Sequence, residues 1–167
     1  LGGHPQVKTP AMARLAELGA TLTNAHSLAP LCNPSRTSLM TARRPTTTGI
    51  YGLSPWIRSV DGLTDLETIP QHFHKHGYKT LLGGKIHHGG NGRRKNPKSE
   101  ADVWGPPAKV GARPKQKQIG ETPGGNHPSM DWGTFPHEDE DKGDWVVASW
   151  AVEQLDELSK SPDQPFF

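Results

Sequence analysis

The only cysteine in the chain, Cys32, begins a stretch that could attack and hold a small oxyanion ester. Asn33 is a good helix cap and Pro34 suits a first helical position, so we predict a helix over residues 35–44. Cys32 would then lie at a helix N-terminus, where free N–H groups and the helix dipole favour an anion. Arg36 would add a fixed positive charge one turn further on. A lone cysteine is more often a small buried apolar residue, so these residues alone leave both interpretations open.

A second cluster, residues 83–90 (Gly-Gly-Lys-Ile-His-His-Gly-Gly), follows a predicted buried strand over residues 78–82. Ligands of open α/β sheets bind beyond the carboxyl ends of the strands, and glycines let the backbone approach them closely. Lys85 offers a positive charge to an anionic oxygen. His87 or His88 could give a proton to a leaving alkoxide, because the pKa of histidine lies near working pH. We expect three earlier histidines to be solvated: His72, His74 and His76.

The Cys32 stretch resembles the signature of the type I, formylglycine-dependent sulfatases. Its Cys-x-Pro-Ser-Arg string is followed by Leu39, Thr41, a small residue and Arg43. The small residue is Ala42, where the family commonly has glycine. The resemblance implies that Cys32 is oxidised after synthesis to formylglycine, whose hydrated aldehyde is the nucleophile. It also implies that position 32, once oxidised, is a ligand of Ca²⁺.

The Lys85 cluster resembles the Gly-Lys-x-His or Gly-Lys-x-x-His element of the same family, so His87 and His88 both fit. The longer spacing with a following glycine looks most like iduronate-2-sulfatase and its bacterial relatives, which favours His88. The resemblance implies that Arg36 and Lys85 bind the sulfuryl oxygens while His88, or His87, protonates the leaving oxygen. The other calcium ligands, an Asp-Asp pair and an Asp-Asn or Asp-His pair, are expected outside this chain.

These resemblances imply hydrolysis of a sulfate ester on a sulfated carbohydrate, as in polysaccharide degradation. The implied partners are that substrate and a formylglycine-generating or anaerobic sulfatase-maturing enzyme. One alternative is a phosphodiesterase or phosphonate monoester hydrolase of the alkaline phosphatase superfamily, which can carry the same motif. Another is a non-catalytic relative that binds a sulfated glycan and keeps its thiol. Export to the periplasm, the cell surface or the exterior is expected, although no signal peptide is visible.

The implied fold is α/β: an alkaline-phosphatase-like sandwich with a central mixed, mostly parallel sheet flanked by helices. The residue patterns agree, because they predict helices that alternate with strands. The helices are expected over residues 10–18, 66–76 and 144–160, and the strands over 20–25, 78–82 and from about 165. The last helix should bury one face, made of Val147, Trp150, Ala151, Gln154, Leu155 and Leu158.

Composition limits the remaining possibilities. With 19 glycines, 16 prolines and 32% hydrophobic residues, the chain is expected to be rich in loops. We expect residues 1–167 to be a fragment of an N-terminal sulfatase catalytic domain, cut at both ends and inactive alone, with a loop-rich insertion over residues 89–142. A net charge of +2 indicates no nucleic-acid partner. No apolar run is long enough to predict a transmembrane segment.

Overall fold

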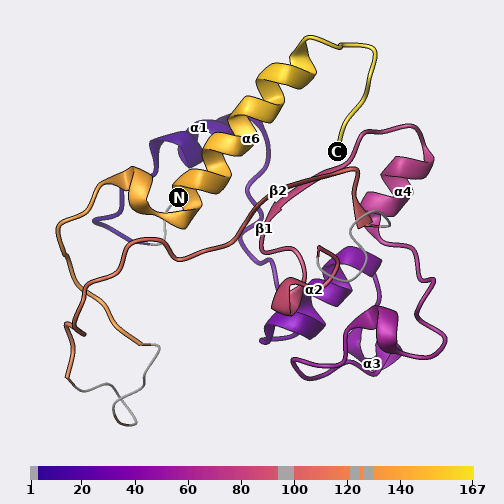
Figure 1. The fold of residues 1–167 in the computed structure, drawn as a ribbon, viewed down its shortest axis with the longest axis horizontal. Coiled ribbons are helices and arrows are strands. Elements are labelled where there is room, and N and C mark those ends of the chain that lie inside the picture. The colour runs from indigo at the N-terminus through magenta and orange to yellow at the C-terminus, as the bar shows by residue number, and fades with distance from the viewer. Residues whose placement is uncertain (1–3, 94–99, 121–124, 126–129) are drawn as a thin grey trace.

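The computed structural model describes residues 4–93, 100–120, 125 and 130–167, which form an α/β arrangement of helices beside a parallel pair of strands (Figure 1). In chain order the elements are α1 (Pro10–Leu18), α2 (Cys32–Thr41), α3 (Pro45–Thr48), η1 (Ile57–Ser59), α4 (Ile69–Lys75), β1 (Leu81–Gly84), η2 (His88–Gly90), β2 (Val103–Pro107), η3 (Asp139–Asp141) and α6 (Gly143–Ser159). The elements marked η are single 3₁₀ turns. The predicted α/β class is confirmed.

β1 has a parallel neighbour on each edge. On one edge Leu81 lies opposite Val103 of β2. On the other, the Lys79 N–H donates to the carbonyl oxygen of Pro165 (2.9 Å) and the Phe167 N–H donates to that of Lys79 (2.9 Å). The strand predicted over residues 78–82 therefore exists, and the extended segment expected from about residue 165 pairs with its beginning.

A partly buried polar contact joins the start of β1 to the start of β2. Thr80 is fully buried, and both its N–H and its hydroxyl donate to one carboxylate oxygen of Asp102, at 2.8 and 3.0 Å. His74 of α4 places Nδ1 3.1 Å from the same oxygen. Partial burial works to raise the pKa of Asp102, but the hydrogen bonds from Thr80 and His74 outweigh it and the pKa is lowered. The charged carboxylate thus holds α4, β1 and β2 together.

Helix α6 covers the sheet through one tryptophan. A Cβ placed on Gly83 would lie 2.7 Å from the Trp150 ring, and one placed on Gly105 would overlap the same ring. The helix predicted over residues 144–160 is confirmed, and most of its predicted inner face is buried or half-buried. Leu155 is the exception, at 52% exposed. It projects about 80° away from Val147 around the helix axis, at the edge of that face.

Two local predictions near Cys32 are wrong. Residues 20–25 form no strand, and Leu22 is 80% exposed, because the described residues place no neighbouring strand beside them. Asn33 is not the cap of α2: Leu31 is, and the buried Asn33 amide instead donates to the carbonyl oxygens of Gly52 (3.1 Å) and Pro55 (2.9 Å). The helix also ends at Thr41, three residues earlier than predicted, because Ala42 turns into the left-handed conformation.

The described part of the chain has little apolar core. One cluster, made of Ile50, Trp56 and Ile57, lies within the segment between α3 and α4. The apolar residues of α1 are exposed: Met12, Leu15 and Leu18 are 58%, 71% and 79% accessible. Among the described residues, no helix has the length and apolarity needed to cross a membrane.

Candidate active site

The N-terminus of α2 presents Cys32 beside a hollow. Cys32 is the first residue of the helix and is half-buried, while Leu31 before it is extended (φ −135°, ψ 143°). The free N–H groups of the first helical turn are therefore next to the thiol. The hollow has a volume of about 400 Å³ and is lined by Ser27, Ala29, Pro30, Leu31, Cys32, Ser35, Arg36 and Leu39. Cys32 thus lies at a helix N-terminus, as predicted, although the helix starts earlier than expected.

The two clusters singled out in the sequence meet in space. Lys85 is exposed and its Nζ lies 3.3 Å from the Sγ atom of Cys32, 53 residues away in the chain. Arg36, one turn along α2, donates from one terminal nitrogen to the carbonyl oxygen of Lys85 and, at 3.3 Å, to that of Ile86. One cation, Lys85, therefore lies beside the thiol, and a second, Arg36, ties α2 to the turn that follows β1.

Glycines shape that turn. β1 ends at Gly84, whose φ is +73°, and Gly89 has a φ of +66°. These are left-handed conformations that residues with a Cβ rarely adopt. The intervening residues, Lys85 to His88, can therefore return sharply from the carboxyl end of β1 toward α2, which packs against η2.

The two candidate histidines have different environments. His87 is 8% exposed, with its ring edge-on to Trp56 (centroids 6.5 Å apart) and its Nε2 atom 3.8 Å from a Glu100 carboxylate oxygen. Burial lowers the pKa of His87, and the opposing effect of Glu100 does not restore it. His88 is half-exposed, and its Nδ1 atom is buried without a hydrogen-bond partner among the described residues. Of the two, His88 has the side chain that solvent can reach.

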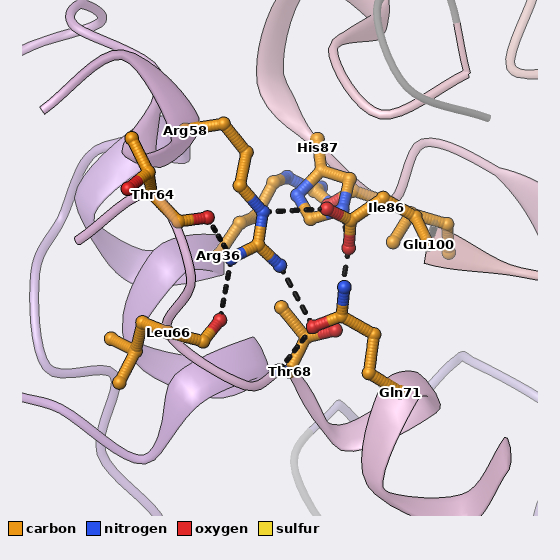
Figure 2. A network of polar contacts seen from close by, with 9 residues as sticks. All are labelled: Arg36, Arg58, Thr64, Leu66, Thr68, Gln71, Ile86, His87 and Glu100. Carbon is orange, nitrogen blue, oxygen red and sulfur yellow. Dashed lines mark hydrogen bonds and ion pairs between the residues drawn. The ribbon is translucent and has the colours of Figure 1, made fainter. Parts of the chain in front are cut away.

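His87 lies next to the buried ion pair of Arg58 and Glu100, which joins distant parts of the chain (Figure 2). Arg58 donates from Nε to Glu100 at 2.8 Å, and the two side chains are 7% and 1% exposed. The same guanidinium donates to the carbonyl oxygens of Thr64 and Leu66 and to the Gln71 side chain. Sequence reasoning missed this group, because its two charged residues are 42 positions apart and neither stands in a recognisable motif.

The described residues do not by themselves suit a calcium ion. They contain no group of three or more His, Cys, Asp or Glu side chains placed to hold a metal. Calcium takes six to eight oxygen ligands, and the buried carboxylate nearest the site, Glu100, is engaged by Arg58 and Thr68. That position 32 is a calcium ligand stays a prediction from the sequence, as do the carboxylate ligands.

A second hollow, of about 520 Å³, lies in the segment between β2 and α6. Its lining includes Arg113, Lys115, Lys117, Trp132, Phe135 and Lys142, with Asp131 as the acidic member. Lys142 lies 4.4 Å from the centre of the Phe135 ring, and Asp131 accepts hydrogen bonds from the backbone of Gln118 and Ile119. The surplus of cations beside exposed aromatic rings suits a ligand with negative charge and a flat apolar face.

Comparison with known proteins agrees with this geometry. The Sulfatase family model matches residues 1–167. A sulfatase of Formosa agariphila is 37% identical to the whole chain, which spans 34% of that protein. Human iduronate 2-sulfatase is 38% identical over 88 residues (53% of the chain, 16% of that protein), and an ulvan-active sulfatase of Formosa agariphila is 36% identical over 91 residues (54% and 17%). With the Cys32 and Lys85 clusters meeting at one helix end, the match along the whole chain shows that this protein belongs to the sulfatase family.

Proposed function

We propose that the protein hydrolyses a sulfate ester, using a formylglycine made from Cys32. The observation that carries this proposal is the contact of Lys85 with Cys32 at the start of α2, where Arg36 holds the turn that carries Lys85. A cationic pocket at a helix N-terminus suits a tetrahedral anion. The sulfatases to which the chain is similar supply the choice of sulfate.

Each residue has a role in this proposal. Oxidised to formylglycine and hydrated, position 32 supplies the hydroxyl that attacks sulfur. Lys85 places its ammonium group beside that position and holds a sulfuryl oxygen as a point charge. Arg36 holds the Lys85–Ile86 turn through two carbonyls and adds positive charge to the same side. His88, which solvent reaches, gives its proton to the departing oxygen.

We further propose the larger setting expected from the sequence. Residues 1–167 would be part of an alkaline-phosphatase-like catalytic domain, with residues 89–142 as an insertion. The formylglycine oxygen would be one calcium ligand, and acidic pairs outside this chain would supply the others. Sequencing the coding DNA on both sides tests this directly. An Asp-Asp pair upstream and an Asp-Asn or Asp-His pair downstream would support the calcium site, and their replacement by apolar residues would contradict it.

A sulfated carbohydrate is the substrate class that we propose. The basic and aromatic hollow between β2 and α6 supports this choice, since sugar rings stack on aromatic side chains while their sulfates pair with cations. The names of the ulvan-active relatives point the same way. Because such polymers lie outside cells, we propose that the protein is exported to the periplasm, the cell surface or the exterior.

The test uses the full-length protein expressed together with a formylglycine-generating enzyme. The mass of the peptide that contains Cys32 should show loss of sulfur and gain of a carbonyl oxygen, and an aldehyde-reactive hydrazide should label it. An unlabelled sample of the same protein should hydrolyse 4-nitrophenyl sulfate, and the Cys32→Ala variant should neither take the label nor show the activity. If the unlabelled protein carries the aldehyde at position 32 but turns over no sulfate ester, that result would contradict the proposal.

The same preparation tests the two alternatives. Faster hydrolysis of a 4-nitrophenyl phosphodiester than of the sulfate would indicate a phosphodiesterase or phosphonate hydrolase, an activity that the similarity to sulfatases does not favour. An intact Cys32 thiol, in a protein that retains a sulfated oligosaccharide without cleaving it, would indicate a non-catalytic glycan-binding relative.

A further inference from the structure

Figure 2 shows the Arg58–Glu100 pair next to His87, which belongs to the turn that follows β1. Glu100 is 1% exposed and uses both carboxylate oxygens, one toward Arg58 at 2.8 Å and the other toward the Thr68 hydroxyl at 3.3 Å. His87 places its Nε2 atom 3.8 Å from that second oxygen. Packing against the buried pair and against the Trp56 ring therefore limits where the His87 side chain can lie.

Because Ile86 and His88 are bonded to His87 through the backbone, a restriction on His87 also restricts them. The carbonyl of Ile86, just before it, accepts a hydrogen bond from Arg36 at 3.3 Å. His88, just after it, begins η2. A shift of the buried ring would move both neighbours, because Gly84 and Gly89 at the ends of the turn offer little resistance.

The Arg58 guanidinium donates hydrogen bonds to several groups around it. Its fork donates to the Glu100 carboxylate, to the Thr64 and Leu66 carbonyls and to the Gln71 amide oxygen. A buried ion pair gives little net stability compared with apolar residues of the same size, because both charges lose their hydration. Such a pair does fix the orientation of its side chains, since a guanidinium bound at several points can take only one orientation.

We propose that Glu100, held by Arg58 and acting through His87, is a positioning residue for His88. The proposal rests on the proposed sulfate-ester hydrolysis and on His88 as its acid. In this arrangement His87 is a positioning residue that does not touch the substrate, and the buried pair sets where the His88 side chain meets the leaving oxygen. Neither Arg58 nor Glu100 touches the substrate.

The dependence of the rate on the leaving group tests this role. A general acid matters for an alcohol that leaves poorly and hardly matters for nitrophenol, which leaves as a stable anion. In the full-length formylglycine-containing protein, Glu100→Gln should lower kcat for an aliphatic or sugar sulfate by about tenfold or more, while kcat for 4-nitrophenyl sulfate changes by less than about threefold. KM for both esters should stay within about twofold.

Three further variants complete the test. His88→Ala should show the same leaving-group pattern with a larger loss, as the acid itself would. Glu100→Asp keeps the charge, so its kcat for the aliphatic or sugar sulfate should lie between those of wild type and Glu100→Gln. This variant keeps the test available if Glu100→Gln folds poorly. Glu157→Gln removes the acid of an exposed ion pair with Lys160 and should leave both rates unchanged.

The outcomes separate the proposal from the function on which it rests. An equal loss of kcat on both esters in both Glu100 variants, in proportion to the folded fraction, would show a purely structural role and overturn the proposal. Unchanged kcat on the aliphatic ester in both variants would overturn it as well. If wild type hydrolyses both esters but His88→Ala loses no more on the aliphatic one, the acid assignment fails and the proposal fails with it. If wild type hydrolyses neither, the proposed function itself fails.

Discussion

Ala42 closes α2 in a backbone conformation that glycine adopts more readily. Among the residues that the structure describes, Ala42 is the non-glycine residue with a positive φ, at 54°. It stands where sulfatases commonly carry glycine. The left-handed conformation costs a residue with a Cβ roughly 1–2 kcal/mol, and part of this is offset by the greater freedom of glycine in the unfolded chain. Ala42→Gly should therefore raise the free energy of unfolding by about 0.5–1 kcal/mol.

Urea denaturation of the full-length protein measures this change in stability. Ala16→Gly, inside α1, is the matched control and should lower the free energy of unfolding by about 0.5–1 kcal/mol, because there the backbone is helical. A loss of stability in both variants would contradict the prediction.

His87 gives a pH dependence with a definite sign. Burial lowers its pKa below the ordinary value near 6.5, with Glu100, Arg58 and Arg36 as the charged groups that act on it. Between the two pKa values the unfolded chain binds more protons than the folded one, so this contribution to stability is complete above pH 6.5 and falls as the pH drops below it. In the full-length protein, His87→Gln should reduce the fall in Tm between about pH 7 and pH 5. The exposed His26→Gln variant should leave that fall unchanged.

The sequence predicted some candidate site residues and not others for a physical reason. Cys32, Arg36 and Lys85 stand in short strings whose spacing has chemical meaning, and the structure brings these strings together. The choice between His87 and His88 depends on burial against Trp56 and Glu100, which are far away in the chain. Local spacing contains no information on such contacts.

At the scale of elements, the contact between α6 and the sheet depends on residues without side chains. The Trp150 ring occupies the space that a Cβ on Gly105 would need. Gly105→Ala should therefore lower the free energy of unfolding by about 1–3 kcal/mol, the usual cost of overpacking. Urea denaturation of the full-length protein measures it.

Two further variants locate the cause of that loss. Gly120→Ala, at a glycine with nothing within 4 Å of the added methyl group, should change stability little. Trp150→Leu, combined with Gly105→Ala, should cost less than the sum of the two single changes, because the smaller side chain leaves room for the methyl group. Strict additivity would show that the two residues do not share this space.

Local sequence signals predicted the helices α4 and α6 more closely than they predicted the strands. The capping box of Thr68 and Gln71 fixes the start of α4, and the apolar period identifies α6. β2 was not predicted, because Val103–Pro107 contains a glycine and two prolines and looks like a loop in isolation. It becomes a strand because β1 and the Thr80–Asp102 contact hold it. The alternating residues 20–25 show the reverse case, a strand-like pattern without a partner strand among the described residues.

At the scale of the whole molecule, much apolar surface is exposed. Six apolar residues are buried among the described ones, whereas Met12, Leu15, Leu18 and Leu22 are all more than half exposed. Expressed as these 167 residues alone, the chain should bind the dye ANS strongly and unfold over a broad range of urea, because little apolar area leaves water on folding. The full-length protein should bind less dye per chain and unfold more sharply. A sharp two-state transition of the 167 residues alone would contradict this expectation.

The parallel pairing of residues 79–81 with 165–167 also sets an order of events during synthesis. The Leu81 N–H donates the last of these hydrogen bonds to the carbonyl oxygen of Phe167, which lies 86 residues further along. Contacts between such distant residues form late, because a long loop must close first. Until the ribosome has passed residue 167, the turn that carries Lys85 is therefore held on one side only. The helix that begins with Cys32 leaves the ribosome well before then, so its thiol has an interval of exposure before Lys85 settles beside it.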